Sequence, residues 1–304
     1  MRRALFVLCL FASLVTGEVY AGAGTTAANF LKLPFGARSS ALGSSFTAFA
    51  EGPEALYHNP AGLANGVFNE GRAVFSKWIQ GTYFGQAAYR HGLDSGGFGA
   101  GITYFNSGEI TRRDLGRRKT GSYSFQSAAI DAGQGLRVSE SLNLGLALRF
   151  IWESVDGEQV NALAGGMGAQ YTRQLSEAHL LRAGVSLENL GTEMGHDGKY
   201  PLPAVLRVGV GDILFDGLLS ASTSINYYFN EENFSGGVGV EYSPVELLDL
   251  RAGYRFGEGS PTPYGFTAGI GIRYVDDMEY VFDISSGYMG DLGFTVMAGT
   301  GVAF

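Results

Sequence analysis

The residues of this sequence that could form ion pairs or line a polar channel are charged residues at alternating positions. Successive side chains of a strand point to opposite faces, and in several segments one face is apolar while the other carries arginines and carboxylates. Facing one another inside a closed sheet, these charges could hold an inserted segment by hydrogen-bonded ion pairs, or they could line a polar channel. The candidate lumen charges are Arg149, Arg207, Arg251, Arg255, Arg273 and Asp249, with Asp131, Asp212 and Glu241 opposite them.

Other polar residues give little support for catalysis or for a metal site. Glu51, Glu54 and His58 lie close together in the sequence, but a metal site needs three or four converging ligands, and no other histidine is near. No spacing singles out a pair of carboxylates for acid–base work, and no Gly-x-Ser-x-Gly elbow stands between a strand and a helix. The sequence therefore predicts no metal, no cofactor and no enzymatic activity, and we expect His58 to be either solvated or hydrogen-bonded between plug and wall.

The N-terminus has the three parts of a secretory signal peptide. Met1-Arg2-Arg3 is a positive start, residues 4–15 are apolar or small, and Val19-Tyr20-Ala21 suits a cleavage site. The alternative is a buried apolar helix. Cleavage after Ala21 would remove Cys9, the sole cysteine, and would change the formal charge from −8 to −9. A mature chain of this kind has no disulfide, and it is too acidic to be a good candidate for nucleic-acid binding.

Composition favours a membrane-embedded sheet over an ordinary soluble domain. Glycine accounts for 47 of 304 residues, about double its average share of roughly 7%. Aromatic residues reach 13% while charged residues are only 16%, against a typical value of about 25%. Residues after Ala21 contain no apolar run long enough for a transmembrane helix.

Period-two alternation runs through the second part of the chain. Residues 142–150 place four leucines and a phenylalanine on one face, and residues 248–256 and 264–275 repeat the pattern. Apolar faces often end in aromatic residues, as expected where rings lie at the lipid headgroups. A soluble two-sheet sandwich is the alternative, because alternation alone does not exclude it.

Counting these segments from residue 67 gives fourteen strands. The alternate connections near residues 139–141, 216–217 and 276–277 are tight, and the two longest, 107–122 and 191–203, both fall on the other side. Bacterial barrels have short periplasmic turns and longer outer loops. The chain ends in Phe304, on the same face as Val296, Ala298 and Val302. The predicted fold is all-β, a 14-stranded antiparallel transmembrane β-barrel. The expected spans are 72–79, 83–91, 97–106, 123–138, 142–154, 161–175, 180–190, 204–214, 219–229, 234–244, 247–256, 264–275, 279–288 and 292–304.

Residues 29–64 resemble the opening of the PorV/PorQ family, relatives of the FadL long-chain fatty-acid transporters. The matching pieces are Gly36-Ala37-Arg38 with Ala41-Leu42-Gly43, then Phe46-Thr47-Ala48, then Asn59-Pro60-Ala61-Gly62. Later pieces such as Asn189-Leu190-Gly191 and Leu250-Arg251-Ala252-Gly253-Tyr254 are similar too. The resemblance implies a fourteen-stranded barrel whose N-terminal segment folds back as a plug. The expected organisation is a signal peptide (1–21), a plug (22–66) and an outer-membrane barrel (67–304).

The plug segment contains the expected binding residues. Its richness in glycine, alanine and serine suits a chain threaded through a lumen. We expect Asn59, Pro60, Ala61 and Gly62 to fix a bend where the plug meets the first strand, since Asn-Pro favours a turn and glycine permits a positive φ. Phe30, Leu33, Phe35, Phe46 and Phe49 are the candidate apolar surface for a ligand, together with Leu31. Packing of the plug against the barrel is the alternative role of these side chains.

A basic run in the largest outer connection is the remaining charged feature. Arg112, Arg113, Arg117, Arg118 and Lys119 lie within residues 107–122. They could contact lipopolysaccharide phosphates or an acidic partner, or they could belong to a solvated loop, which is the commoner case.

Two functions follow from these observations. In the first, the chain is an outer-membrane barrel that passively binds or passes a hydrophobic small molecule beside its plug. In the second, which the PorV resemblance implies, it is an adaptor that binds secreted proteins or a type IX secretion translocon. The predicted outer loops, at most about sixteen residues, offer little surface for a large partner. The expected surroundings are outer-membrane lipid and lipopolysaccharide, with no nucleic acid.

Overall fold

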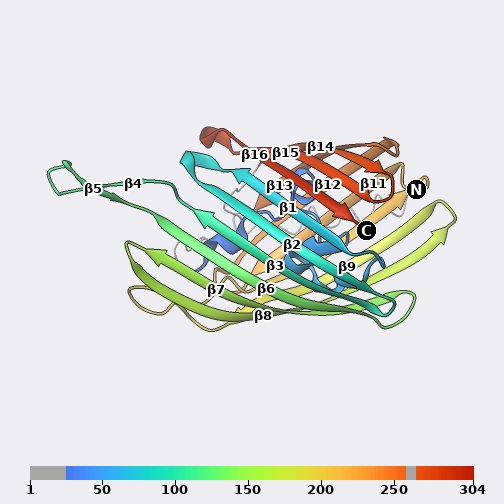
Figure 1. The fold of residues 1–304 in the computed structure, drawn as a ribbon, viewed down its shortest axis with the longest axis horizontal. Helices are drawn as coiled ribbons and strands as arrows, with labels where there is room; N and C mark the ends of the chain where they lie inside the picture. Colours follow the sequence, from blue (N-terminus) through green and yellow to red (C-terminus); the bar gives the residue numbers. More distant parts are fainter. Residues whose placement is uncertain (1–24, 258–264) are drawn as a thin grey trace.

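A closed antiparallel sheet forms the body of the molecule. In the computed structural model, which describes residues 25–257 and 265–304, fourteen strands close into a barrel in the order β1-β16-β15-β14-β13-β12-β11-β10-β9-β8-β7-β6-β3-β2 (Figure 1). Sheet closure excludes the two-sheet sandwich, and it confirms the predicted fold class and strand number.

The predicted signal peptide and cleavage site lie outside the described residues. The strands are β1 (Glu70–Lys77), β2 (Tyr83–Leu93), β3 (Gly96–Asn106), β4 (Ile110–Arg113), β5 (Lys119–Tyr123), β6 (Phe125–Arg137), β7 (Leu142–Val155), β8 (Glu158–Ser176), β9 (His179–Gly191), β10 (Val205–Leu214), β11 (Leu219–Tyr228), β12 (Asn233–Val245), β13 (Leu248–Gly257), β14 (Gly265–Val275), β15 (Glu279–Tyr288) and β16 (Phe294–Ala303).

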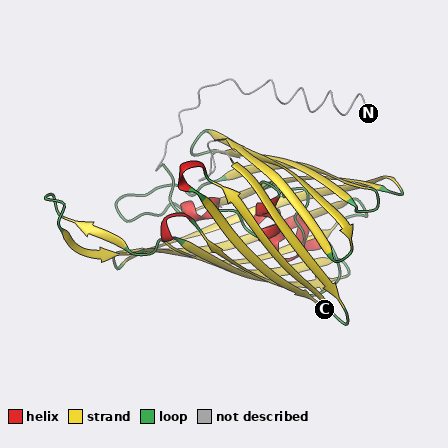
Figure 2. Ribbon diagram, turned by 90° about the horizontal axis from the view of Figure 1, so that it is seen from above, coloured by secondary structure: helices red, strands yellow, loops and turns green. Residues whose placement is uncertain are grey.

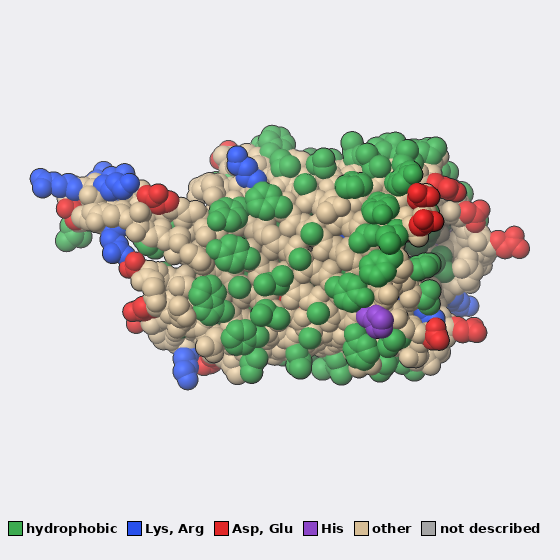
Figure 3. Space-filling view, viewed as in Figure 1, with side chains coloured by type: hydrophobic (Ala, Val, Ile, Leu, Met, Phe, Trp, Pro, Cys, Tyr) green, Lys and Arg blue, Asp and Glu red, His purple; other side chains and the backbone are tan. Residues whose placement is uncertain are grey.

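Alternation along each strand separates an apolar outside from a polar inside. In β7, Leu144, Leu146 and Leu148 are exposed on the outer face, whereas Arg149 is buried in the lumen. Figure 3 shows hydrophobic side chains spread over the barrel wall, with charges gathered at its two ends. An exterior of this kind suits contact with lipid, and the polar groups of the backbone are satisfied within the closed sheet.

The two ends of the barrel differ in their connections. At one end, six turns of two to four residues join the strands, including residues 138–141 and 276–278. Connections 107–124 and 192–204 lie at the other end. The first end is called here the periplasmic end, because short turns face the periplasm in bacterial barrels. The predicted alternation of short and long connections agrees with this arrangement.

The longest connection is not the simple loop that the sequence indicated. Residues 110–123 form a separate two-stranded sheet, β4–β5, which projects beyond the barrel (Figures 1 and 2). All five residues of the basic run are exposed on this hairpin. The prediction missed it because the two strands are only four and five residues long and carry no apolar alternation.

The first and last strands close the barrel. β1 pairs antiparallel with β16 from Glu70 opposite Ala303 to Lys77 opposite Val296. Asn69 and Phe304 extend this ladder by two backbone hydrogen bonds of 3.0 and 2.9 Å. Closure leaves no open strand edge in the barrel wall, which is a condition for a sheet in lipid.

Residues 25–66, called here the lumenal segment, lie inside the barrel. Figure 2 shows short helices of this segment within the ring of strands. Nearly every residue from Phe30 to Ala64 is buried. Among the described residues, no helix has both the length and the apolar character needed to cross a membrane. The short helices are η1 (Asn29–Lys32), α2 (Ala37–Ala41), η2 (Gly52–Glu54), α3 (Ala55–His58) and η3 (Pro60–Ala64), and η4 (Ile79–Gly81) and η5 (Gly290–Leu292) lie in connections between strands.

Glycines on the inner wall allow the lumenal segment to approach the strands closely. A Cβ atom on Gly145 would lie 2.2 Å from the backbone nitrogen of Ala61, and one on Gly237 would lie 1.9 Å from the carbonyl oxygen of Gly43. The opposing atoms belong to backbone and have no flexible end that could move aside. Backbone-to-backbone packing therefore places the segment in the lumen.

Adding one methyl group at such a contact should loosen the packing. We predict that Gly145→Ala destabilises the folded barrel by about 1–3 kcal/mol, the usual cost of overpacking. A matched control is Gly85→Ala, where the nearest atom to an added Cβ is 3.7 Å away. Thermal unfolding followed by the heat-dependent gel mobility of the barrel compares the two. Equal midpoints for both variants would contradict the packing described here.

Candidate functional site

The five predicted ligand-surface residues are all buried, and they divide between two clusters. Phe30 and Leu33 belong to one cluster, with Trp78 from the β1–β2 connection and Phe84 from β2. Phe35, Phe46 and Phe49 belong to the other, where Phe35 stacks on Tyr57 at 4.7 Å between ring centroids. None of the five is more than 7% exposed. Phe30 and Leu33 therefore pack the segment against the wall, whereas the second cluster lies mainly within the segment. Phe46 and Phe49 each also border a cavity at one end of the lumen.

The Asn59–Gly62 motif lies against the inner wall of β6–β8. The Asn59 side-chain oxygen accepts a hydrogen bond from the Ala61 backbone nitrogen at 3.2 Å, and its amide donates to the Ala169 carbonyl at 3.0 Å. The same oxygen also packs against Gly168, where an added Cβ would lie only 2.0 Å from it, so this position has no room for a side chain. One asparagine thus begins the η3 helix and joins it to strand β8.

The expected role of Gly62 was wrong. Gly62 lies within η3, and it is not one of the described residues that have a positive φ. Its lack of a side chain is needed because a Cβ would lie 2.1 Å from the Ala50 carbonyl oxygen. The motif is also several residues from strand β1, which begins at Glu70. It anchors the middle of the packing against the wall and does not form the bend into β1.

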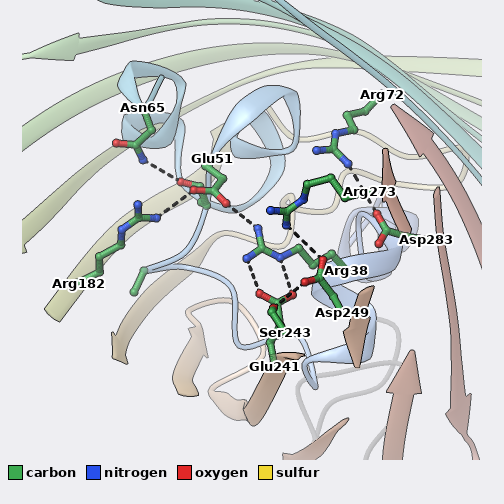
Figure 4. A network of polar contacts seen from close by, with 12 residues as sticks. Arg38, Glu51, Asn65, Arg72, Arg182, Glu241, Ser243, Asp249, Arg273 and Asp283 are labelled. Carbon is green, nitrogen blue, oxygen red and sulfur yellow. Dashed lines mark hydrogen bonds and ion pairs between the residues drawn. The ribbon is translucent and has the colours of Figure 1, made fainter. Parts of the chain in front are cut away.

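Ion pairs join the lumenal segment to the wall near the periplasmic end (Figure 4). Arg38 donates to both carboxylate oxygens of Glu241 at 2.9 and 2.8 Å, and to Glu51 at 2.6 Å. Glu51 also accepts from Arg182 of β9 at 3.0 Å. A two-pronged arginine–carboxylate contact fixes geometry as well as charge, so Arg38 holds α2 to strand β12.

Arg251 is the centre of the charges on the wall. It is 1% exposed and contacts Glu241 at 2.5 Å, Asp283 at 2.5 Å and Asp249 at 3.0 Å. Asp249 also pairs with Arg273 at 3.2 Å, and Asp283 with Arg72 at 3.6 Å. The structure thus brings together four of the predicted charges, namely Glu241, Asp249, Arg251 and Arg273.

The other predicted lumen charges lie apart from this network. Arg149 pairs with Asp131 at 2.5 Å and donates to Asn189 at 2.6 Å. Arg207 is 3.5 Å from Glu188. Asp212 contacts His179 at 2.9 Å. Arg255 has no ion pair among the described residues, so it departs from the predicted pattern.

Sequence reasoning missed the residues that carry the network into the segment. Arg38, Glu51 and Arg182 were not among the candidate charges, although Arg38 belongs to a matching family motif. No strand periodicity marks Arg38 or Glu51, because the segment has no regular repeat. Their partners are 203 and 131 residues away in the chain, a separation that a single sequence does not reveal.

Three titratable groups of the lumenal segment respond to these surroundings. Burial would raise the pKa of Glu51, but Arg38 and Arg182 lower it to about 2. Burial raises the pKa of Glu54 to about 7, and the nearby Arg72 offsets only part of this effect. Burial lowers the pKa of His58 to about 4, so its imidazole is neutral and contacts the Phe35 carbonyl at 2.7 Å. The described residues contain no group of three His, Cys, Asp or Glu side chains that could hold a metal ion.

Polar cavities surround the network. One of about 300 Å³ and another of about 560 Å³ are both lined by Arg38, Glu51, Arg182, Asp249 and Arg273. Because charged groups line this end of the lumen, it favours water and ions over apolar molecules.

An apolar groove of about 500 Å³ lies in the wall at β6–β9. Its lining includes exposed outer side chains, namely Leu136, Leu144, Leu146, Met167 and Val185. Gly145 and Gly168 also line it. On the inner side, Gly145 faces the backbone of Pro60 and Ala61, and Gly168 faces the side chains of Asn59 and Pro60. At this point a single layer of backbone separates the groove from the lumenal segment.

Comparisons with known proteins show the fold. No family model and no curated protein matches the chain. The toluene transporter TbuX of Ralstonia pickettii is 16% identical, with a TM-score of 0.64 over 90% of this chain and 98% of that one. The toluene transporter TodX of Pseudomonas putida is 16% identical, with a TM-score of 0.60 over 88% and 96%. A Pseudomonas aeruginosa FadL homologue is 10% identical, with a TM-score of 0.50 over 88% and 96%. The chain has the fold of FadL-type outer-membrane barrels.

Removing one carboxylate from the network should cost more than removing an exposed one. Glu241→Gln removes the carboxylate that Arg38 and Arg251 share, although Arg38 keeps Glu51 and Arg251 keeps Asp249 and Asp283. We predict a loss of about 1.5–3 kcal/mol in unfolding free energy, the usual contribution of hydrogen bonds to charged groups. Glu279, 41% exposed and paired with Arg273, is the control, and Glu279→Gln should change stability by at most about 1 kcal/mol. Denaturant unfolding in detergent measures both. Similar losses for the two variants would show that the network does not hold the segment.

The raised pKa of Glu54 predicts that the stability of the folded barrel depends on pH. In the folded state the Glu54 carboxyl group stays protonated up to about pH 7, whereas in the unfolded chain it loses its proton near pH 4.5. Glu54 therefore lowers stability as pH rises through this window. His58 acts in the opposite direction, but it is unchanged in Glu54→Gln. The variant should gain stability relative to the wild type between pH 4.5 and 7, as measured by unfolding midpoints. A constant difference would contradict the shift.

Proposed function

We propose that this chain is an outer-membrane barrel that passively binds and passes a hydrophobic small molecule, with the lumenal segment as its plug. The observation that carries this proposal is the apolar groove at β6–β9. A hydrophobic molecule dissolved in lipid would find there a recess lined almost wholly by aliphatic side chains, and burial of apolar surface favours its binding.

The wall beside the groove is interrupted. Pairing between β8 and β9 shifts between Gly165 and Met167, so that Gly166 lies opposite both Glu188 and Asn189. Asn189 has a φ of 60°. A small cavity at this point is lined by plug residues Leu56 and Pro60 and also by wall residues. The small cavity beside the plug therefore lies at a break in the hydrogen-bonded ladder, where little rearrangement would connect it with the outer groove.

A route straight through the lumen is less favourable. An apolar molecule would have to cross the cavities lined by Arg38, Arg182 and Arg273 and displace water from charged groups, without forming hydrogen bonds in return. Passage beside the plug and through the wall avoids this end of the barrel. Similarity in fold to two toluene transporters supports small hydrophobic molecules as the cargo.

The proposal includes the setting expected from the sequence. We place the chain in the bacterial outer membrane, exported by a signal peptide, in contact with lipid and lipopolysaccharide and without enzymatic activity. The resemblance in residues 29–64 supports a relation to the PorV/PorQ branch of the FadL-like barrels.

An adaptor function is the second candidate, and the β4–β5 hairpin favours it. This hairpin projects from the outer end of the barrel, with its cations gathered on it (Figure 3). It offers more surface to a secreted protein or a type IX translocon than the sequence predicted. If the adaptor function is correct, removing residues 110–123 should abolish co-purification of the partner while the barrel remains folded.

Filling the groove should block the proposed function. We predict that Val185→Trp lowers the uptake of radiolabelled toluene by liposomes containing the barrel at least several-fold, because the indole would occupy the recess. Ile284→Trp is the matched control, since Ile284 is an outward aliphatic residue, 61% exposed, on strand β15. Equal uptake by the two variants would reject the groove as the route. Uptake by the wild-type barrel that is no faster than in protein-free liposomes would also reject it.

A further inference from the structure

The β4–β5 hairpin carries a concentrated positive charge on a chain that is acidic as a whole. Residues 110–123 contain five of the 21 Lys and Arg residues, whereas the formal net charge of the whole chain is −8. Asp114 is the one carboxylate in this stretch, so five positive charges and one negative charge give it a formal charge of +4. All five cationic side chains are exposed, and Figure 3 shows them gathered on the projection. The hairpin is therefore a basic surface held away from the barrel wall.

The two faces of the hairpin have different contacts. On one face, Arg112 pairs with Asp156 of the β7–β8 turn, and its guanidinium lies over the Tyr123 ring at 5.6 Å. On the other face, Arg113 lies directly opposite Lys119, and like charges in this position repel and destabilise a sheet. The first face thus steadies the hairpin against the neighbouring turn. The second face holds two cations together at a cost that a bound anion would remove.

The turn of the hairpin adds two more arginines, one of them in a strained backbone conformation. Arg117 has a φ of 62°, which lies in the left-handed region that glycine adopts far more easily than arginine. Its nitrogen donates to the Asp114 carbonyl at 2.9 Å, and the Asp114 nitrogen donates to the Arg118 carbonyl at 3.0 Å. Arg113 donates to the Arg117 carbonyl at 3.0 Å, so its guanidinium lies beside the turn. A side chain kept where it strains the backbone indicates that the side chain has a function.

A belt of aromatic rings marks the level at which the chain leaves the wall to form the hairpin. Four ring pairs join neighbouring strands at the outer end, with 4.6–6.3 Å between ring centroids and at least one ring of each pair exposed. The pairs are Phe75–Tyr83, Tyr227–Phe234, Tyr254–Phe266 and Tyr288–Phe294. In outer-membrane barrels, such belts lie at the boundary between lipid chains and headgroups. Tyr83 is opposite Asn106, the last residue of β3, so the hairpin connection begins at this boundary.

The cations of the hairpin lie beyond this boundary, in the layer of the lipid headgroups. Arg112 is six residues after Asn106, and at about 3.3 Å for each extended residue it is at most about 20 Å along the chain from the belt. Lipopolysaccharide, the lipid of the outer leaflet, carries its phosphate groups on the sugars just outside its acyl chains. Hydrogen bonds from arginine and lysine to phosphate are among the stronger ones in proteins, because both partners are charged. Charge and position therefore suit the same ligand.

We propose that the β4–β5 hairpin is a binding site for the phosphate groups of lipopolysaccharide. The binding side chains are Arg113, Arg117, Arg118 and Lys119. Lys119 is 3.6 Å from Glu109, but an exposed pair of this kind contributes little, and a phosphate displaces it. The site rests on the outer-membrane setting of the proposed function, but not on the passage of a hydrophobic molecule. An acidic protein is the other ligand for a basic hairpin, and lipopolysaccharide is favoured because the connection starts at the aromatic belt.

Titration of the full-length barrel in zwitterionic detergent with fluorescent bisphosphorylated lipid A tests this site by fluorescence anisotropy. The wild type should bind saturably, and its affinity should fall as salt is added, because salt screens exposed charges. Each cation beside an anionic surface contributes roughly fivefold to the affinity. The double variant Arg113→Gln with Arg118→Gln should therefore bind at least tenfold more weakly. Lipid A without its phosphates should bind to the wild type at least tenfold more weakly as well.

Three further variants separate the charge of the hairpin from general effects. Arg113→Lys with Arg118→Lys keeps the charge and should bind several-fold more tightly than the glutamine pair. Arg173→Gln with Lys199→Gln removes the same charge from exposed positions on β8 and the β9–β10 connection, and it should bind as the wild type does. Arg117→Gly relieves the strain in the turn, yet it should weaken binding about fivefold because one cation is lost. Unchanged heat-dependent gel mobility shows that each variant is folded.

The site is overturned if the wild type does not bind lipid A saturably, or if the glutamine pair at Arg113 and Arg118 binds as tightly as the wild type. An equal loss in the pair at Arg173 and Lys199 would overturn it too. Polyglutamate that binds the wild type more tightly than bisphosphorylated lipid A would identify an acidic protein as the ligand instead. Toluene uptake should be the same for the wild type and the glutamine pair at Arg113 and Arg118, so a failure of lipid A binding is distinguishable from a failure of the proposed function.

Discussion

A closed sheet of fourteen strands encloses more space than its own inward side chains can fill, and the lumenal segment fills it. Glycines on the inner wall let the backbone of the segment approach that of the strands, as at Gly145 and Gly237. Asn59 and Arg38 then fix the packing at two places with directional bonds. The buried phenylalanines and the ion-pair network form only because the segment occupies the lumen. The same holds for the contact of the segment with the inner wall at β6–β9.

Filling the lumen also divides the barrel into regions of different polarity. The periplasmic end is lined by paired charges and polar cavities, whereas the wall at β6–β9 has an apolar recess outside and the lumenal segment inside. The route proposed for a hydrophobic molecule runs through the side because it avoids the charged end.

The sequence predicted the barrel well because its signal is local. Alternation in residues such as 142–150 depends on neighbours in the chain, and the count of fourteen strands and the order of short and long connections follow from it. The site was predicted only in part. Arg251, Arg273 and Asp249 could be placed in the lumen by their strand phase, but Arg38 and Glu51 lie in a segment without a repeat. The role of Gly62 depends on the carbonyl of Ala50, and the hairpin at 110–123 has strands too short to show a pattern.

The most direct measurement is photolabelling of the barrel in liposomes with a diazirine-bearing monoaromatic hydrocarbon, followed by peptide mapping. The proposed route predicts labels enriched on Leu144, Leu146 and Met167 over equally exposed outer residues such as Ile270 and Val296, with further labels on Leu56 and Pro60 inside. Uniform labelling of the outer face with none on the plug, as for a probe simply dissolved in lipid, would contradict it.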